Sequence, residues 1–429
     1  MNYSERLNRS IPGGAHTYSR GDDQFPENAP QILASGEGCR VWGPDGDSYL
    51  DYGMGLRAVT VGYANKPIAK AAQAEILKGN CLTRASLTEL KAAELLCDII
   101  PTAEMVKFAK NGSVTTTAAV KLARAYTGRD IVVTCEDHPF FSYDDWFIGS
   151  TVVSSGVPAA CAKDTLRFKY GNIDSLETIF AKNPKKIAAV IMEAATVVEP
   201  KKGFLKSVEK LCAQEGAVFI LDEMITGFRW HKQGAQKYFG IRPDLSTFGK
   251  GMANGFSVAA LAGKREIMEL GGIQHDKERV FLASTTHGAE MCGLGAFIKT
   301  MEVYDEKKVV EHLWTYGKKL MALGNGLAKS HGISENFNFY GFPCSPGYAT
   351  LDGDCKPSLE FRTLFSQEMV KSGVLIPWVA LSRAHGDKEL ERTGRALDTA
   401  FDVYSKALDR GIGKYLKSKP IKPVFRKYN

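Results

Sequence analysis

Lys250 stands in surroundings that are unusual for a structural lysine. The stretch "STFGKGMANG" (246–255) places a glycine on each side of it, and the apolar run "FSVAALAG" follows. An ammonium group is strongly hydrated, and moving it out of water is costly unless it is paired. Small neighbours and a buried segment therefore indicate either an ion pair or an amine that reacts.

A pair of carboxylates stands at the end of a predicted strand. The run "AVFILDE" (217–223) is apolar and ends in Asp222 and Glu223. A carboxylate beside a buried sheet needs a cationic or protonated partner. Asp222 and Lys250 could form a plain ion pair or a catalytic pair, and these two residues alone do not decide between the two.

A short turn before a helix is the third feature that could do chemistry. In "KNGSVTTTAAVKLARAYTG" (110–128), Gly112 and Ser113 open directly into a predicted helix. Backbone N–H groups at a helix N-terminus, together with the hydroxyls of Ser113, Thr115 and Thr116, form a suitable cradle for a phosphate dianion. An ordinary helix cap is the alternative for such a turn.

Together, the phosphate cradle, the carboxylate and the lysine are what pyridoxal 5'-phosphate (PLP) requires. The lysine would form a Schiff base with the cofactor, and the carboxylate would keep the pyridine nitrogen protonated so that the ring can accept electrons. Glycines beside Lys250 would let the backbone and the cofactor ring approach closely. We therefore predict that Lys250 and Asp222 are catalytic.

The elements that must position these residues predict an α/β fold. Helical stretches at 113–126 and 204–215 alternate with β-branched runs at 131–135, 187–193 and 217–223. Strands that are apolar on both faces and alternate with helices form a mostly parallel sheet covered on both sides. Ligands bind such sheets at the C-terminal ends of the strands.

The chain is predicted to divide into three segments. Residues 1–60 are rich in Gly, Pro and turn pairs, which indicates irregular segments and short hairpins. Residues 61–304 carry the alternating pattern and are expected to form the large cofactor-binding domain. Residues 305–429 contain long helical stretches and a few strand candidates, and with the N-terminal segment they are expected to form a smaller α+β domain.

Composition fits an enzyme better than a small binding module. The chain has 429 residues, 44% of them hydrophobic, so it can bury a sizeable core. No run approaches the roughly 18 apolar residues of a membrane span, and the polar stretch "MNYSERLNRS" lacks the apolar region that a signal peptide has. Its nine cysteines are scattered without a CxxC pair. We expect reduced thiols, no structural metal and a cytoplasmic location.

The C-terminal segment is strongly basic. From Gly411 to Asn429 it carries six Lys or Arg and no acidic residue. Such a tail could bind nucleic acid or an anionic surface. No nucleic-acid-binding motif accompanies it, so we expect a solvated, partly frayed C-terminus and no nucleic-acid partner.

The chain resembles class III aminotransferases of PLP fold type I, and within them the glutamate-1-semialdehyde 2,1-aminomutase branch. Motifs in the family's order carry the resemblance, among them "GCRVWGPDGDSYLDY", "LDEMITGFR", "PDLSTFGKG" and "STTHGAEMCGLGA". The resemblance implies a large domain with a mostly parallel seven-stranded sheet sandwiched by helices, and a smaller α+β domain. It also implies a homodimer with active sites at the subunit interface.

Residue by residue, the resemblance implies that Lys250 is the Schiff-base lysine and that Asp222 faces the pyridine nitrogen. Gly112 and Ser113 fall on the phosphate turn. The further cofactor contacts that it implies are Met224 against one ring face, Glu193 after its strand, and Thr285, which would reach the phosphate of the neighbouring subunit.

The chain departs from the family around the substrate. Arg20 matches an arginine that holds the substrate carboxylate in the aminomutase, whereas Arg57 stands where that enzyme has glycine. The family's "YHG" motif is replaced by "DHPFF" (137–141), so either Phe140 or His138 is expected to cover the other ring face. The residues expected to line the substrate pocket therefore differ from those of the aminomutase.

These departures favour transamination over isomerisation. We expect PLP to cycle with pyridoxamine 5'-phosphate while an amino group moves from a donor to a small aldehyde or ketone. Arg57 and the basic tail suggest that the acceptor is anionic or sugar-related. The alternatives are a glutamate-1-semialdehyde 2,1-aminomutase and, more remotely, an inactive scaffold homologue.

Overall fold

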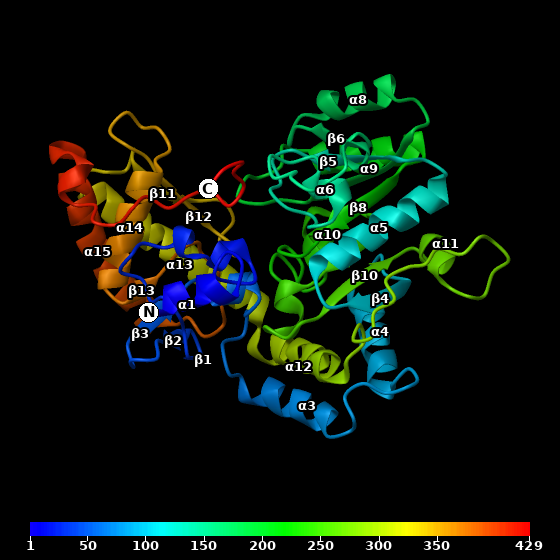
Figure 1. Ribbon diagram of the computed structural model, residues 1–429, viewed down its shortest axis with the longest axis horizontal. Helices are drawn as coiled ribbons and strands as arrows, with labels where there is room; N and C mark the ends of the chain where they lie inside the picture. Colours follow the sequence, from blue (N-terminus) through cyan, green and yellow to red (C-terminus); the bar gives the residue numbers. More distant parts are fainter. The chain divides into compact units, whose positions relative to one another are not determined.

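The structure is a computed structural model that describes every residue from Met1 to Asn429 (Figure 1). The chain forms two compact units, which we call the terminal unit and the central unit. The terminal unit comprises Met1–Asn65 and Glu311–Arg426, and the central unit comprises Lys66–Val310 and Lys427–Asn429. Each is described by itself below.

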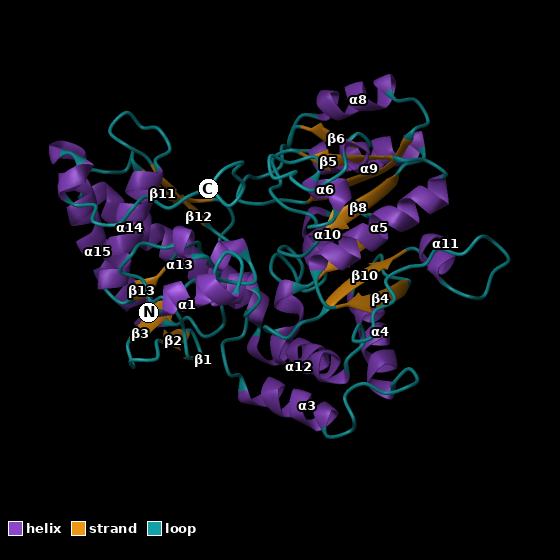
Figure 2. Ribbon diagram, in the orientation of Figure 1, coloured by secondary structure: helices purple, strands orange, loops and turns teal.

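A seven-stranded sheet forms the centre of the central unit (Figure 2), in the order β4-β10-β9-β8-β7-β5-β6. The strands are β4 (Met105–Ala109), β5 (Ile131–Cys135), β6 (Thr165–Phe168), β7 (Ile187–Glu193), β8 (Val218–Asp222), β9 (Leu245–Phe248) and β10 (Ala259–Gly263). Only β10 runs antiparallel to its neighbours, β4 and β9. Since β10 is antiparallel to both of its neighbours, β4 and β9 run in the same direction, and β8 is parallel to β9. The strands β4, β8 and β9 therefore all end at the same edge of the sheet.

Helices cover both faces of this sheet. Helix α5 packs on β7, β8, β9 and β10, whereas α9 packs on β8 and contacts α8. In the strand order, the connection from β4 through α5 to β5 runs towards β6, whereas the connection from β7 through α9 to β8 runs towards β4. Because both crossovers are right-handed, α5 and α9 lie on opposite faces of the sheet. The helices of the unit are α3 (Lys66–Ile76), α4 (Leu87–Ile99), α5 (Gly112–Thr127), α6 (Asp145–Ile148), α7 (Ala159–Ala162), α8 (Ile173–Lys182), α9 (Phe204–Glu215), α10 (Gly234–Phe239), α11 (Arg265–Met268) and α12 (Met291–Lys307), with 3-10 turns η3 (Lys250–Ala253) and η4 (Glu269–Gly271).

Small residues on α5 bring it close to the sheet. Ala119, Leu122 and Ala123 are fully buried in one cluster with Val132 and Ile220 of the strands. The helix ends at Gly128, which adopts a left-handed conformation with φ +65° that a glycine tolerates without strain. This packing fixes the N-terminus of α5 at the sheet edge where β4 ends.

The terminal unit combines a small sheet with three long helices. Its four-stranded sheet has the order β1-β2-β3-β13, and a separate hairpin is formed by β11 and β12. The elements are α1 (Tyr3–Ser10), β1 (Ser35–Glu37), β2 (Arg40–Trp42), β3 (Ser48–Asp51), α2 (Met54–Arg57), α13 (Val309–Ser330), β11 (Phe337–Tyr340), β12 (Gly347–Thr350), α14 (Leu359–Lys371), β13 (Val374–Leu375) and α15 (Asp387–Arg410), with η1 (Tyr18–Arg20), η2 (Asp22–Gln24) and η5 (Ile412–Lys414). Segments from both halves of the chain, 1–65 and 311–426, thus build one unit.

An aromatic cluster forms part of the core of the terminal unit. The ring of Phe337 on β11 lies 4.9 Å from that of Phe365 on α14 and 4.6 Å from that of Phe401 on α15. Tyr52, the residue after β3, stacks on His385, and its hydroxyl forms hydrogen bonds with those of Tyr316 and Thr393. Segments distant in sequence are therefore joined by packing.

The predicted fold class is confirmed. The strands predicted at 131–135 and 187–193 occur with the same bounds, and the one predicted at 217–223 spans Val218–Asp222. The predicted helix at 204–215 is α9, capped by Gly216. These segments were predictable because uninterrupted apolar runs and glycine caps are local signals.

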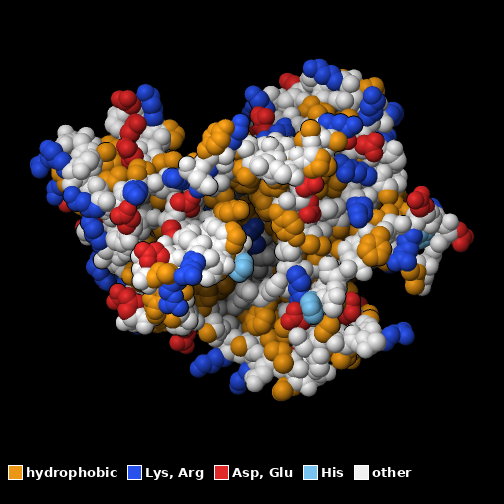
Figure 3. Space-filling view, viewed as in Figure 1, with side chains coloured by type: hydrophobic (Ala, Val, Ile, Leu, Met, Phe, Trp, Pro, Cys, Tyr) orange, Lys and Arg blue, Asp and Glu red, His pale blue; other side chains and the backbone are white.

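The C-terminal segment is largely exposed, as expected, but the prediction that it is partly frayed is wrong for residues 417–426. Backbone and side-chain groups of Lys417, Ser418, Ile421, Lys422 and Arg426 are bonded to the rest of the terminal unit. No helix of the structure has the length and apolar content that a membrane crossing requires. In Figure 3, basic and acidic side chains are interspersed on the visible face of each unit, in keeping with the mild net charge of +7.

Candidate active site

The ends of two neighbouring strands carry the predicted catalytic pair. Asp222 is the last residue of β8 and lies opposite Thr247 of the parallel strand β9. Lys250 begins η3, just after β9 ends. Because parallel strands end at a common edge, both residues belong to that edge. Burial raises the pKa of Asp222, and the positive charge of Lys250 acts in the opposite direction, so the two groups are near enough to influence each other's charge.

Asp222 is a buried carboxylate with few partners. Its side chain is 3% exposed, and Oδ1 accepts hydrogen bonds from the Met224 N–H at 2.8 Å and the Thr247 hydroxyl at 3.2 Å. Burial raises the pKa of Asp222 to about 6, against the lowering effects of these bonds and of Lys250. The ionised form of such a buried carboxylate is stabilised when a further positive charge lies beside it.

Glu223, the neighbouring carboxylate, serves the fold. Its side chain points to the start of α10, where Oε2 and Oε1 accept the N–H groups of Ala235 and Gln236, each at 2.9 Å. The hydroxyl of Thr226 donates to Oε2 as well. Because successive residues of a strand face opposite sides, only one of the two acids can face the site.

The predicted phosphate turn lies at the N-terminus of α5. Asn111 caps the helix by accepting the N–H of Val114 at 3.1 Å. Ser113 is 4% exposed, and its Oγ accepts the N–H of Tyr143 at 3.1 Å. The first N–H groups of a helix have no carbonyl partner within it. Those of Gly112 and Ser113 are therefore suited to an anion.

Met224 brings the phosphate turn and the lysine turn to one place. A Cβ built on Gly112 would lie 3.0 Å from the sulfur of Met224, and one on Gly249 would lie 2.7 Å from it. A side chain at either position would displace the thioether. The two glycines thus let Gly112, Met224 and the residue before Lys250 meet, which makes a compact cradle.

Lys250 itself has a strained backbone. Its φ is +40°, in the left-handed region that residues with a Cβ rarely adopt. Such conformations cost free energy and persist where surrounding packing imposes them, often at functional sites. Here the imposed turn directs a half-buried lysine away from the regular path of β9.

His138 and Glu193 continue the row of strand ends. Glu193 ends β7 opposite Asp222, and its N–H donates to Nδ1 of His138 at 3.0 Å. His138 is 3% exposed, and burial lowers its pKa to about 4, so its ring is neutral at pH 7. Phe140, by contrast, is 45% exposed and meets Phe147 edge to face.

An ion pair that the sequence did not reveal connects the phosphate turn to the segment of Thr285. Lys110, which precedes the turn, lies 2.9 Å from a carboxylate oxygen of Glu290, and its Nζ donates to the Ser257 carbonyl at 3.1 Å. The pair is partly buried, and hydrogen bonds from Cys292 and then from Lys110 hold the pKa of Glu290 at about 2. Because the two residues are far apart in sequence, no local pattern could have indicated the contact.

Thr285 itself is exposed in this structure. Its carbonyl accepts the N–H of Gly288 at 3.1 Å, and a Cβ on Gly288 would lie 2.6 Å from its hydroxyl oxygen. Glycine at 288 therefore keeps this turn tight. The turn presents Thr285 at the surface of the central unit.

The two predicted substrate arginines lie in the terminal unit. Arg20 ends η1 and is exposed. Burial raises the pKa of Asp51, and the charge of Arg20 is the smallest of the effects that lower it. Asp51 is buried and accepts the hydroxyl of Tyr63 at 2.7 Å. Arg20 is thus accessible and within electrostatic range of a buried carboxylate.

Arg57 is presented by a left-handed turn. Met54, Gly55, Leu56 and Arg57 have φ values of +39°, +56°, +62° and +68°. Asp51 stabilises the start of this turn by accepting the N–H groups of Gly53 at 2.6 Å and Met54 at 2.9 Å. Consecutive non-glycine residues in this region are costly, so the turn is imposed by its surroundings.

Trp378 supports the same turn. Its Nε1 donates to the Gly53 carbonyl at 3.1 Å, and the guanidinium carbon of Arg57 lies 6.0 Å from the centre of its ring. That distance is within reach of a cation–π interaction. The indole thus limits the rotamers open to Arg57.

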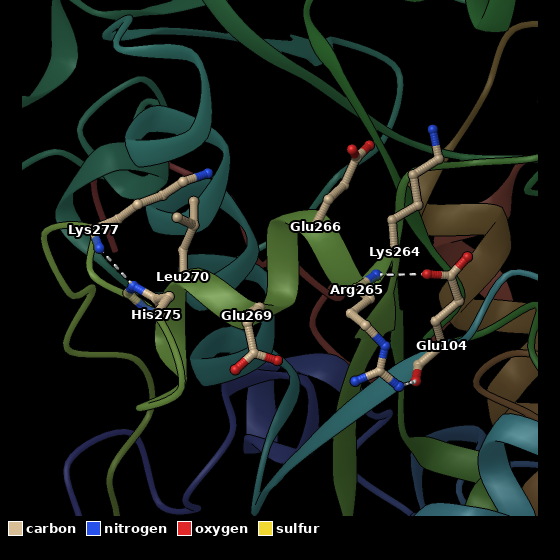
Figure 4. Close-up of a pocket in the computed structure, with 8 residues that line it drawn as sticks. All are labelled: Glu104, Lys264, Arg265, Glu266, Glu269, Leu270, His275 and Lys277. Carbon is tan, nitrogen blue, oxygen red and sulfur yellow. Dashed lines mark hydrogen bonds between the residues drawn. The ribbon is translucent and has the colours of Figure 1, made fainter.

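A pocket of about 620 Å³ lies apart from these residues, at α11 and the loop that follows (Figure 4). Its side chains carry charges of both signs, and Arg265 donates from its backbone to Glu104 at 2.8 Å. The lining residues are Glu104, Lys264, Arg265, Glu266, Glu269, Leu270, His275 and Lys277. None of them is a predicted site residue.

The sheet edge therefore gathers a lysine, a buried carboxylate and a helix N-terminus, and these residues fit PLP. The model of the class III aminotransferase family matches residues 23–335, so the chain belongs to the class III aminotransferase family. The resemblance inferred from the motifs is confirmed.

Relatives with assigned names include both kinds of enzyme that the sequence suggested. A glutamate-1-semialdehyde 2,1-aminomutase of Alkaliphilus oremlandii (strain OhILAs) is 32% identical over 94% of this chain and 98% of its own. A 3-aminobutyryl-CoA aminotransferase of Cloacimonas acidaminovorans (strain Evry) is 30% identical over 95% and 98%. The PLP internal aldimine form of the Sphingopyxis sp. MTA144 FumI protein superposes with a TM-score of 0.87 at 26% identity, over 98% of each chain.

Proposed function

We propose that this class III enzyme is a PLP-dependent aminotransferase that moves an amino group from a donor to a small aldehyde or ketone. The observation that carries the proposal is the meeting of Asp222, Lys250 and the N-terminus of α5 at one sheet edge. PLP supplies the electron sink that makes bonds at the donor's α-carbon labile, and it alternates with pyridoxamine 5'-phosphate.

Lys250 and Asp222 have separate roles in this proposal. Lys250 is the Schiff-base lysine that anchors the cofactor, and its Nζ afterwards removes and returns the α-proton of the donor. Asp222 remains ionised beside the ring nitrogen and keeps a proton there. This role is supported by the burial of Asp222, which raises its pKa and makes a neighbouring positive charge stabilising.

The remaining cofactor contacts follow from burial and position. The Gly112 and Ser113 amides hold the phosphate. Met224 packs against one face of the ring. Phe140 is assigned to the other face, because Nδ1 of the buried His138 already accepts the N–H of Glu193.

We propose that the acceptor is anionic. Arg57, on its strained turn against Trp378, and the accessible Arg20 supply two permanent positive charges within the terminal unit. Guanidinium groups bind carboxylates and phosphates in a bidentate manner. An aminomutase remains the second candidate because Arg20 matches its carboxylate-binding arginine and named relatives are aminomutases.

A half-reaction screen tests the function. The holoenzyme is mixed with single amino donors, including L-glutamate, and conversion to the pyridoxamine form is followed by absorbance. A transaminase releases the keto product of the donor, whereas an aminomutase converts glutamate-1-semialdehyde without a second substrate. A protein that fails to bind PLP or responds to no amine would instead be the inactive scaffold.

We further propose a homodimer in which Thr285 binds the phosphate held by the partner subunit. Its exposed position on a tight turn supports this role. Thr285→Ala should weaken cofactor binding by about ten- to a hundredfold, since a hydrogen bond to a charged group is lost. Equilibrium dialysis measures the change, and Thr286→Ala in the same turn serves as the control.

The assembly can be tested with the same proteins. If cofactor binds across the interface, dilution should release it as dimers dissociate, and added PLP should favour the dimer in analytical ultracentrifugation. A monomer that binds PLP as tightly as the dimer would rule out the shared site. We also propose a cytoplasmic location, which the nine unpaired cysteines support. The domain limits that we predict from the sequence, 60/61 and 304/305, lie a few residues before the limits of the two compact units at 65/66 and 310/311, and limited proteolysis can locate them.

A further inference from the structure

The basic C-terminal segment is tied to the terminal unit by buried side chains. We call residues 415–426 the C-terminal strap. Gln367 of α14 is 1% exposed, and its Oε1 accepts the N–H groups of Lys417 at 2.8 Å and Ser418 at 3.2 Å. Further along, the N–H of Ile421 donates to the Thr363 hydroxyl at 2.9 Å. Leaving such buried polar groups unpaired is costly, so the strap is fixed.

The strap next contacts the segment that follows Arg20. The N–H of Lys422 donates to the Asp23 carbonyl at 2.9 Å, and Gln24 Nε2 donates to the Lys422 carbonyl at 2.9 Å. Arg426 then forms an ion pair with the Asp23 carboxylate at 2.6 Å, with both side chains partly buried. These bonds hold η2 in place from one side.

The other side of η2 is held by the first helix. Asn8 of α1 donates to the Asp22 carboxylate at 2.8 Å, and the hydroxyl of Ser4 donates to the same oxygen. Between Arg20 and η2 there is only Gly21, which is buried; a Cβ there would lie 3.2 Å from the carbonyls of Gly13 and Tyr18. The position of η2 therefore sets the position of Arg20.

We propose that the C-terminal strap positions Arg20 for the substrate carboxylate, chiefly through the Asp23–Arg426 ion pair. The inference rests on the proposed role of Arg20. An exposed arginine has many rotamers and a short 3-10 turn has little stability of its own, so fixing the turn before the substrate arrives lowers the entropic cost of binding. At least one positive charge of the basic C-terminal segment, that of Arg426, is thus paired within the protein.

Two variants of the full-length holoenzyme test the positioning, Asp23→Asn and Arg426→Ala. Amide hydrogen exchange of residues 17–25 should become faster in both, while exchange in α14 stays unchanged. The KM for L-glutamate should rise by about two- to fivefold, the range of a partly exposed ion pair, with kcat unchanged. The response to 1-phenylethylamine, which has no carboxylate, should not change.

Controls separate this role from general stability and from charge. Arg426→Lys keeps the positive charge and should restore most of the wild-type KM. Lys419→Ala removes a strap charge whose side chain makes none of the contacts with Gln367, Thr363 or Asp23, and it should have no effect. A fluorescent single-stranded DNA that binds the wild type but not Arg426→Ala would overturn the inference, because the tail would then serve a nucleic acid.

Arg20→Ala separates the role of Arg20 itself from the role of the strap. If it leaves the KM for L-glutamate unchanged, the role of Arg20 and the inference both fail. If it raises that KM while Asp23→Asn and Arg426→Ala change neither KM nor the exchange of residues 17–25, the strap alone is excluded and the proposed function stands. Combining Arg20→Ala with Arg426→Ala should add nothing to the KM, since one acts through the other.

Discussion

Lys250→Ala should reduce amino transfer by about 10⁴-fold or more while the protein remains folded, because the anchor of the cofactor and the base for the α-proton are lost together. The backbone strain at residue 250 is independent of the amine, so alanine can occupy the same turn. Activity is measured in single-turnover assays, and folding by circular dichroism and melting temperature.

The covalent role has its own readout. Borohydride reduction should attach the cofactor to the wild-type chain at Lys250, and mass spectrometry should find no such adduct in the variant. Lys264→Ala is a suitable control, because this half-exposed lysine pairs with Asp244 elsewhere in the central unit. Activity of Lys250→Ala within about tenfold of wild type would remove the lysine from the mechanism.

Asp222→Ala should lower the rate by roughly 10³-fold, since the ring nitrogen loses the charge that keeps it protonated. Glu223→Gln, one residue further on, should instead lower the melting temperature and leave kcat nearly unchanged, because Glu223 caps α10. Single-turnover rates and thermal melts of both variants give the comparison. A slow Glu223→Gln enzyme with a fast Asp222→Ala enzyme would reverse the assignment.

The pH dependence of stability offers a check on Asp222 that does not involve activity. Burial raises the pKa of Asp222 from 3.8 to about 6 in the cofactor-free fold. The folded-state pKa lies above the unfolded one, so the stabilising contribution is complete at low pH and is lost as pH rises through 6. The melting temperature of the cofactor-free wild type should therefore fall more between about pH 5 and about pH 7 than that of Asp222→Asn.

Local patterns in the sequence were sufficient to predict much of the fold. Continuous apolar runs such as 187–193 indicate strands buried on both faces, and glycines such as Gly128 and Gly216 mark the ends of helices. Lys250 and Asp222 could be paired as candidates because Asp222 lies at the end of such a run and Lys250 lies just before another apolar run, "FSVAALAG". These signals can be read from a single sequence because they depend only on neighbours in the chain.

Only the tertiary structure shows which of two similar residues serves the site and which distant residues are in contact. Asp222 and Glu223 are adjacent and chemically similar, and only the packing of α10 on Glu223 shows which of them serves the fold. The Lys110–Glu290 pair joins residues that the sequence keeps far apart.

The basic tail shows the same limit of sequence reasoning. Its composition predicted a solvated end, because charged residues are usually exposed and no local pattern announces a buried partner. The partners are Gln367 on α14 and Asp23 near the N-terminus, which reach the tail only once both ends of the chain have folded into one unit. Sequence determines which side chains can bond, whereas chain topology determines which of them meet, and that is why the role of the tail could be inferred only from the folded protein.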